Sequence, residues 1–89
     1  MPAEEAGREV PVIQLYYDPR CPFCQHVLQY LEDNEIPFEP KIISLSADSP
    51  TKRELVRLGG KAQVPFLVDP ENGVEMYESG DIVAYLERL

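Results

Sequence analysis

The chain has 89 residues, of which 44% are hydrophobic, and a formal net charge of -8 at pH 7. This length and composition predict one globular domain with a modest core. The negative charge argues against binding to nucleic acid or to anionic membrane surfaces, because both attract a basic face. No apolar run approaches the roughly 18 residues of a membrane span. Glu4 and Glu5 stand where a signal peptide would be basic, so we expect a cytoplasmic protein.

The first half of the chain contains a leader, a strand and a helix. We predict a flexible N-terminal leader over residues 1–9, which show no periodicity, and a folded domain over residues 10–89. The near-continuous apolar run Val10–Tyr17 is typical of a strand buried on both faces and indicates the central strand of a sheet. Apolar residues then recur at helical spacing and predict a helix that ends near Glu35.

The middle of the chain predicts a second strand and a second helix. Residues 38–45 form the strand, which we place on a sheet edge because Pro40 has no N–H to donate to a neighbour. Ser49 and Pro50 are the types favoured at an N-cap and at the first helical position. The pair Gly59-Gly60 ends the helix. We expect its apolar residues to form a buried stripe: Leu55, Val56 and Leu58.

The last third predicts a hairpin followed by a helix. Residues 66–68 and 74–77 are short strands joined by the turn 69–73, which contains the hairpin dipeptide Asn-Gly. Ser79 is predicted to cap the final helix. Four of its apolar residues are expected to face inward: Ile82, Val83, Leu86 and Leu89. The element order is βαβαββα, which indicates an α/β fold with a four-stranded mixed sheet flanked by three helices.

Both cysteines lie at the start of the first helix, in the stretch Cys21-Pro22-Phe23-Cys24. A helix N-terminus favours the thiolate, which is the reactive form of cysteine. Arg20 adds a positive charge beside Cys21, and Asp18 opposes it with a negative one; we expect Arg20 and the helix terminus to dominate. Cys24 lies about one turn along the same face, within reach of a disulfide formed at Cys21. The pair is therefore predicted to act as nucleophile and resolving thiol.

Two other roles for these cysteines are less well supported. A structural disulfide between Cys21 and Cys24 would close a loop so small that it would stabilise the fold little. A zinc site within one chain needs four ligands, and the nearby sequence offers these two cysteines and His26. We therefore expect no metal site.

Strand directions predict that three separate segments meet at one edge of the sheet. If the first two strands are parallel and the third is antiparallel to the first, Cys21 and Val64-Pro65 lie at the same edge. The hairpin then returns the start of the last helix, at residues 79–81, to that edge. Two helix N-termini around one cleft favour an anionic ligand.

These motifs resemble the glutaredoxins and the closely related N-terminal domain of glutathione transferases, both of thioredoxin-like fold. The similarity runs from Val10 to the end of the chain. It rests on three segments and their spacing: Cys21-Pro22-Phe23-Cys24 after a strand, Gln63-Val64-Pro65 before another strand, and Glu78-Ser79-Gly80-Asp81-Ile82 after a hairpin.

The resemblance implies a glutathione site. It implies a cis Val64-Pro65 peptide beside the active sulfur, with the Val64 backbone pairing with the cysteinyl part of glutathione. It implies that Ser79 holds the γ-glutamyl carboxylate and Glu78 the ammonium group, as a helix N-terminus beside a carboxylate would. Weaker candidates for the glycine carboxylate are Lys61, Gln63 and Arg20. Phe23, which stands between the two cysteines, is a further candidate for binding glutathione. Tyr16 or Tyr17 could also line the cleft, although core packing is the default interpretation for both.

Two features depart from the family pattern. Asp18 stands where many glutaredoxins carry lysine. Glutathione transferases continue into a helical domain that binds their second substrate, and this sequence ends at Leu89, so we expect a transferase proper to be less favoured than a glutaredoxin.

The predicted function is that of a glutathione-dependent thiol–disulfide oxidoreductase acting on disulfide-containing or glutathionylated proteins. Cys21 attacks the mixed disulfide, and a second glutathione or Cys24 resolves the adduct. Glutathione is the reducing co-substrate, and we expect a monomer. One alternative is a carrier in which glutathione and Cys21 from two chains hold a [2Fe–2S] cluster. Another is a non-catalytic, transferase-like binding module.

Overall fold

The structure, a computed structural model, describes residues 12–88, so the predicted leader and the start of the first predicted strand lie outside the described residues. Within these residues the chain follows the predicted order βαβαββα. The elements are β1 (Ile13–Tyr17), α1 (Pro22–Asp33), β2 (Phe38–Ile42), α2 (Pro50–Gly59), β3 (Phe66–Asp69), β4 (Val74–Tyr77) and α3 (Ser79–Glu87). The second strand therefore ends before Leu45, and the first helix ends slightly earlier than expected.

The described strands form a mixed sheet in the order β2-β1-β3-β4. β1 runs parallel to β2, because α1 carries the chain back between them, and antiparallel to β3. β3 and β4 form the predicted hairpin. β2 lies at one edge, which confirms the placement of Pro40. This arrangement, with helices on both faces, is a thioredoxin-like α/β fold.

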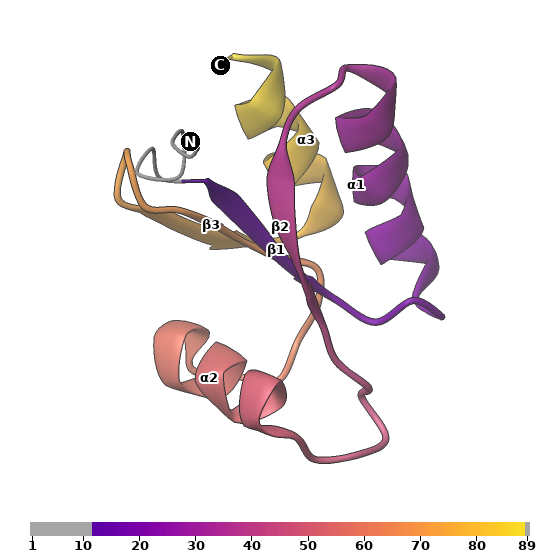
Figure 1. Cartoon of the computed structure of the whole chain (residues 1–89), viewed down its shortest axis with the longest axis vertical. Coiled ribbons are helices and arrows are strands. Elements are labelled where there is room, and N and C mark those ends of the chain that lie inside the picture. The colour runs from indigo at the N-terminus through magenta and orange to yellow at the C-terminus, as the bar shows by residue number, and fades with distance from the viewer. Residues whose placement is uncertain (1–11, 89) are drawn as a thin grey trace, which may run out of the picture.

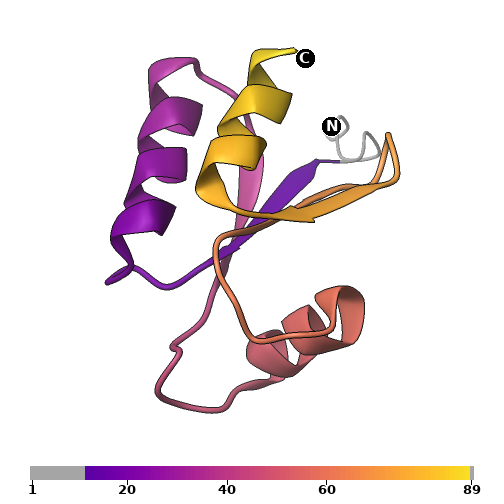
Figure 2. The same cartoon turned by 180° about the vertical axis from the view of Figure 1, so that it is seen from behind.

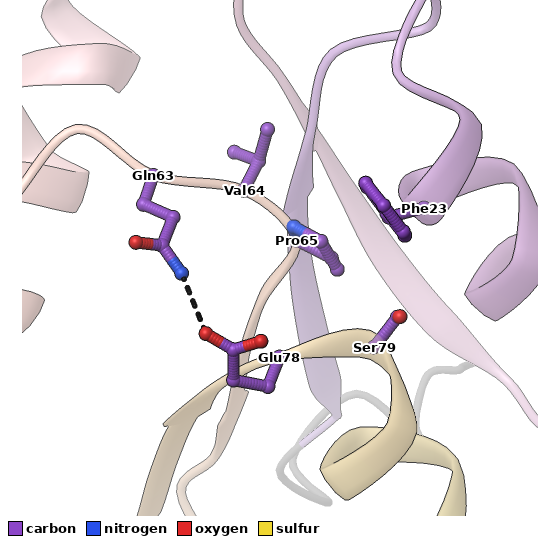
Figure 3. Close-up of a pocket in the computed structure, with 6 residues that line it drawn as sticks. All are labelled: Phe23, Gln63, Val64, Pro65, Glu78 and Ser79. Atoms are coloured by element: carbon purple, nitrogen blue, oxygen red, sulfur yellow. Dashed lines mark hydrogen bonds between the residues drawn. The ribbon is translucent and has the colours of Figure 1, made fainter.

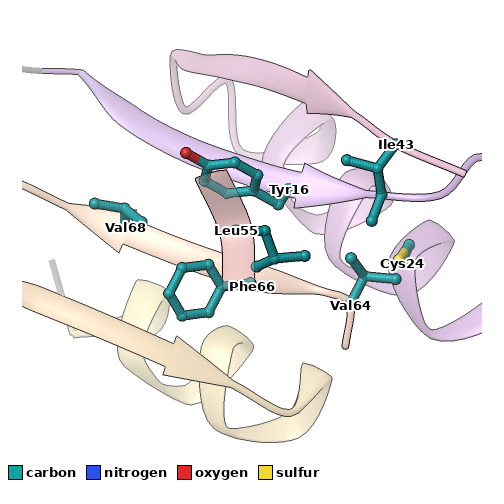
Figure 4. Packing of buried hydrophobic residues seen from close by; sticks show 7 residues of the cluster. All are labelled: Tyr16, Cys24, Ile43, Leu55, Val64, Phe66 and Val68. Atoms are coloured by element: carbon teal, nitrogen blue, oxygen red, sulfur yellow. The ribbon is translucent and has the colours of Figure 1, made fainter. Parts of the chain in front are cut away.

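The helices cover the two faces of the sheet in separate layers. Figures 1 and 2 show α1 and α3 side by side on one face and α2 alone on the other. The core beneath α1 and α3 is built from Leu15, Val27, Leu31, Leu67, Ile82 and Leu86. The core beneath α2 is built from Tyr16, Cys24, Ile43, Leu55, Val64, Phe66 and Val68 (Figure 4). Alternate residues of β1 and β3 enter opposite cores, as the period of a strand requires.

α2 has the predicted ends but a narrower buried face than expected. The Ser49 hydroxyl accepts a hydrogen bond from the Lys52 N–H at 3.1 Å, and Gly60 takes a left-handed conformation with φ 94°. Leu55 is fully buried, whereas Val56 and Leu58 are 39% and 38% exposed. The prediction of a buried stripe was wrong for Val56 and Leu58. α2 lies alone on its face of the sheet (Figure 1), so only the side of the helix that carries Leu55 is covered.

α3 begins one residue earlier than predicted. Its N-cap is Glu78, with φ 74°, and Ser79 is its first helical residue, so the prediction of Ser79 as the cap was wrong. Ile82 and Leu86 are buried and Val83 packs against the core as expected, while Leu89 lies outside the described residues. In the part of the chain that is described, no helix has the length and apolar character needed to cross a membrane.

Candidate functional site

The two cysteines differ sharply in their surroundings. Cys21 is the N-cap of α1, with extended backbone, and its N–H donates to the Asp18 carbonyl at 2.9 Å. Pro22 follows at the first helical position, where its missing N–H costs nothing. Cys21 is half-buried, whereas Cys24, one turn later, is fully buried in the core beneath α2. Cys21 is therefore the thiol that an external disulfide can reach.

The register of the sheet brings three segments to the edge where Cys21 lies. Tyr16 is opposite Phe66, and Phe66 is opposite Tyr77. The residues after β1, before β3 and after β4 therefore share one edge, as the strand directions predicted. Cys21 packs against the core cluster that contains Val64, and the Val64-Pro65 peptide is cis as the resemblance implied.

These segments enclose a pocket of about 310 Å³. Figure 3 shows Phe23, on α1, facing Pro65, with Glu78 and Ser79 at the start of α3 below them. The residues lining the pocket were all predicted as site residues: Phe23, Gln63, Val64, Pro65, Glu78 and Ser79. The structure thus places them in one cavity beside the thiol helix.

The polar side of the pocket is formed by Gln63, Glu78 and the start of α3. The Gln63 side-chain amide donates to the Glu78 carboxylate at 3.2 Å (Figure 3). Glu78 is exposed and Ser79 half-buried, so both remain accessible to a ligand. The first N–H groups of α3 are available to an anion, because a helix leaves its first backbone donors without intrahelical partners. A ligand carrying both an anionic and a cationic group suits this side.

Two predicted basic residues lie elsewhere among the described residues, outside the lining of this pocket. Arg20 donates from its guanidinium group to the hydroxyls of Ser44 and Ser46, each at 3.3 Å. The Lys61 Nζ lies 4.8 Å from the centre of the Tyr77 ring. Neither side chain lines the pocket in this arrangement. Their predicted contact with the glycine carboxylate of glutathione therefore stays a prediction.

The tyrosines offered as cleft residues also lie elsewhere. Tyr16 is fully buried beneath α2, where core packing was the default interpretation, and Tyr17 packs against both cores. Burial raises the pKa of Tyr16, and the nearby Glu54 carboxylate raises it further. Tyr16 therefore contributes to the fold rather than to the pocket.

Burial raises the pKa of Cys24 to about 12. A hydrogen-bond interaction with Cys21 and the charges of Cys21 and Asp18 act in the same direction, while a hydrogen bond from the Asp18 backbone opposes them. Cys24 is therefore a neutral thiol at physiological pH, which gives it a role secondary to that of Cys21.

The sequence indicated Asp18 as a negative charge near Cys21, but it did not predict that Asp18 is buried. It is 4% exposed, and its two carboxylate oxygens accept the N–H groups of Arg20 and Leu45, each at 2.9 Å. These hydrogen bonds lower the pKa of Asp18, so it is a carboxylate at neutral pH. The contact with Leu45 joins loops 27 residues apart, which explains why local sequence patterns did not reveal it.

Over residues 12–88, no group of three or more histidine, cysteine, aspartate or glutamate side chains is arranged to hold a metal ion.

The fold and the site define a thioredoxin-like protein with a cis-proline beside a two-cysteine helix start. The family model for the glutathione S-transferase N-terminal domain matches residues 15–89, and the chain belongs to this family. A search of curated proteins found no match.

Solved structures similar to the chain come from several classes. A glutathione S-transferase from the Antarctic clam Laternula elliptica has 32% identity and a TM-score of 0.75, over 86% of this chain and 34% of its own. Glutaredoxin 2 from Salmonella typhimurium, in complex with glutathione, has 26% identity and a TM-score of 0.70, over 85% and 33%. A Chlamydomonas reinhardtii dehydroascorbate reductase has 25% identity and a TM-score of 0.67, over 86% and 38%. The chain therefore spans about a third of the length of these proteins.

Proposed function

We propose that the chain is a glutathione-dependent thiol–disulfide oxidoreductase of the dithiol glutaredoxin type. The observation that carries the proposal is the placement of a half-buried thiol, Cys21, at a helix N-terminus packed against the same cluster as Val64, one of the pocket residues. Family membership and the glutathione bound to the similar glutaredoxin 2 support glutathione as the ligand.

The pocket suits the chemical groups of glutathione. The Val64 backbone precedes the cis peptide and offers its N–H and carbonyl to the cysteinyl part of the tripeptide. The start of α3 at Ser79 provides N–H donors for the γ-glutamyl carboxylate. The Glu78 carboxylate accepts a hydrogen bond from the γ-glutamyl ammonium group. This bond replaces the one that Glu78 receives from the Gln63 side chain in the free protein.

The reaction consists of two disulfide exchanges. The Cys21 thiolate attacks the glutathione sulfur of a protein–glutathione disulfide, forms a Cys21–glutathione disulfide and releases the protein thiolate, which takes a proton from water. A second glutathione thiolate then attacks the bound glutathione sulfur, releasing oxidised glutathione and the Cys21 thiolate. Alternatively Cys24 attacks Cys21 and releases reduced glutathione, and two further glutathione molecules reduce the resulting disulfide.

The test is the reduction of a glutathionylated peptide by glutathione with the wild-type protein and two cysteine variants. Cys21→Ser is expected to abolish turnover, whereas Cys24→Ser keeps a good part of it, because glutathione can replace a resolving thiol that is buried and neutral. Equal loss in both variants would indicate a strictly dithiol, thioredoxin-like route. Absence of turnover in the wild type would overturn the proposal.

Ligand binding is tested separately by titrating the protein with reduced glutathione. Glu78→Gln removes the charge that would pair with the ammonium group and is expected to weaken binding about tenfold. Glu75→Gln is the matched control, since Glu75 is an exposed glutamate of the preceding strand, β4, and does not line the pocket. Equal affinities of Glu78→Gln and Glu75→Gln would contradict the assigned role of Glu78.

Family membership also favours a second candidate, a transferase-like module that binds glutathione without redox turnover. The two assays separate the candidates, because this module would bind glutathione and leave the glutathionylated peptide intact. A coloured dimer after anaerobic reconstitution with iron and sulfide would instead identify the cluster carrier.

A further inference from the structure

Tyr77 connects two of the segments that enclose the pocket. It is the last residue of β4 and stands directly before the pocket residue Glu78. Its hydroxyl donates a hydrogen bond to the Lys61 carbonyl at 2.8 Å. Lys61 lies in the loop that runs from the end of α2 to the pocket residues 63–65. Tyr77 therefore joins the two segments, although it is not among the described residues that line the pocket.

The position of the Tyr77 ring depends on a glycine in α2. A Cβ at Gly59 would overlap the Tyr77 hydroxyl. The next residue, Gly60, needs glycine for its left-handed backbone, with φ 94°, whereas Gly59 is helical and its backbone suits other residues. The approach of the ring is therefore what requires glycine at position 59. Elsewhere the ring packs 4.6 Å from the centre of the Phe66 ring, and the Lys61 Nζ lies 4.8 Å from its own centre.

Glutathione binding increases the importance of the Tyr77 hydrogen bond. Among the described residues, two side-chain hydrogen bonds join the loop 61–65 to residues 77–79: the bond from Tyr77 and the bond from Gln63 to Glu78 (Figure 3). In the proposed function, Glu78 exchanges its bond from Gln63 for one from the ammonium group of glutathione. Of these two bonds, the one from Tyr77 then remains to hold the loop against the start of α3.

We propose that Tyr77 is a positioning residue for the glutathione pocket: its hydroxyl holds the loop 61–65 in the arrangement that the ligand needs. The inference rests on the proposed function, in which this pocket binds glutathione. Affinity falls in proportion to the fraction of molecules whose loop is in the binding arrangement. The Cys21 backbone is fixed separately, by its hydrogen bond to the Asp18 carbonyl. Loss of the Tyr77 hydroxyl should therefore weaken glutathione binding and leave the Cys21 thiol unchanged.

The test compares the wild type with Tyr77→Phe, which keeps the ring and removes the hydroxyl. The Kd for reduced glutathione, measured by isothermal titration calorimetry, is expected to rise about fivefold, as the loss of one hydrogen bond implies. In the reduction of a glutathionylated peptide, the KM for the peptide should rise while kcat stays within about twofold of the wild-type value. The rate of Cys21 alkylation by iodoacetamide should keep the wild-type dependence on pH.

Tyr85→Phe is the matched control. Tyr85 also donates its hydroxyl to a neighbouring segment, but its acceptor is the Asp69 carboxylate, at the end of β3 that lies away from the pocket. This variant is expected to lose thermal stability and to bind glutathione with the wild-type Kd. A purely structural effect would instead weaken binding in both tyrosine variants.

Gly59→Ala reaches the same hydrogen bond from α2. It forces the Tyr77 ring to move and changes none of the residues that line the pocket. It is expected to weaken glutathione binding at least as much as Tyr77→Phe does.

The outcomes separate the role of Tyr77 from the proposed function. Wild-type affinity in Tyr77→Phe or Gly59→Ala, an equal loss of affinity in Tyr85→Phe, or a shifted alkylation profile of Cys21 would each overturn the inference, while reduction of the peptide by the wild type upholds the proposed function. A wild type that binds glutathione without reducing the peptide would overturn the proposed function alone, and the comparison of affinities would still decide the role of Tyr77. A wild type that does not bind glutathione would overturn both.

Discussion

Replacing a helical glycine with alanine usually raises the free energy of unfolding, but we expect Gly59→Ala to lower it. A Cβ at Gly59 would lie 2.0 Å from the Tyr77 hydroxyl oxygen and 2.7 Å from the adjoining ring carbon, so Tyr77 must move. The ring is not free to do so: its hydroxyl donates to the Lys61 carbonyl at 2.8 Å, and it lies 4.6 Å from the Phe66 ring. The substitution therefore breaks contacts between α2 and the hairpin.

The magnitude follows from the contacts that are lost. The hydrogen bond contributes about 1 kcal/mol, and the aromatic pair contributes about 0.5–1.5 kcal/mol. Alanine gains at most about 1 kcal/mol over glycine in a helix interior, and less at a helix end such as Gly59. The expected net loss is about 1–2 kcal/mol, which in a domain of this size lowers Tm by about 4–8 °C for each kcal/mol.

The assay is thermal and urea denaturation of Gly59→Ala beside Gly80→Ala. A Cβ at Gly80, in the first turn of α3, meets nothing within 4 Å, so this control should be neutral or slightly stabilised. Adding Tyr77→Leu to Gly59→Ala should cost less than the sum of the two single changes, because the clash disappears with the ring. A Gly59→Ala protein as stable as the wild type would refute the reasoning.

Two further predictions concern the core and the acid response. Leu55→Ala is expected to lower the free energy of unfolding by about 2–5 kcal/mol, whereas Val56→Ala at its exposed neighbour should change it by less than about 1 kcal/mol; equal urea midpoints would contradict this assignment. Burial disfavours ionised Asp69, but hydrogen bonds from Tyr85 and Asn72 outweigh it and lower the pKa of Asp69. The stabilisation that ionised Asp69 contributes is therefore fully present above about pH 3.9, the pKa of this group in the unfolded chain. It is lost as the pH falls through the lower pKa that Asp69 has in the folded protein. Tyr85→Phe should cost about 1–2 kcal/mol near neutral pH and flatten this acid dependence; an unchanged slope of unfolding free energy against pH would count against the role of Tyr85.

Much of the candidate site was predictable because its residues stand beside strand ends. Strand directions alone placed Cys21, Val64-Pro65 and the start of the last helix at one edge, and the register confirms this. The resemblance implied the residues that line the pocket, because each of them lies in a short motif that can be recognised without its tertiary neighbours. The contacts that Arg20 and Lys61 make could not be predicted, because a long side chain contacts whichever segment lies nearby, here Ser44 and Ser46 for Arg20 and the Tyr77 ring for Lys61.

The amino-acid sequence by itself determined the order of strands and helices, the position of the thiol helix and the ends of α2, because periodicity, caps and turn residues act over a few neighbouring positions. Only the tertiary structure decided that Val56 and Leu58 face solvent and that Cys24 belongs to the core. It alone brought the Asp18 carboxylate to the Leu45 N–H across 27 residues. Burial and hydrogen bonding between distant segments depend on how the layers pack, and no local pattern carries that information.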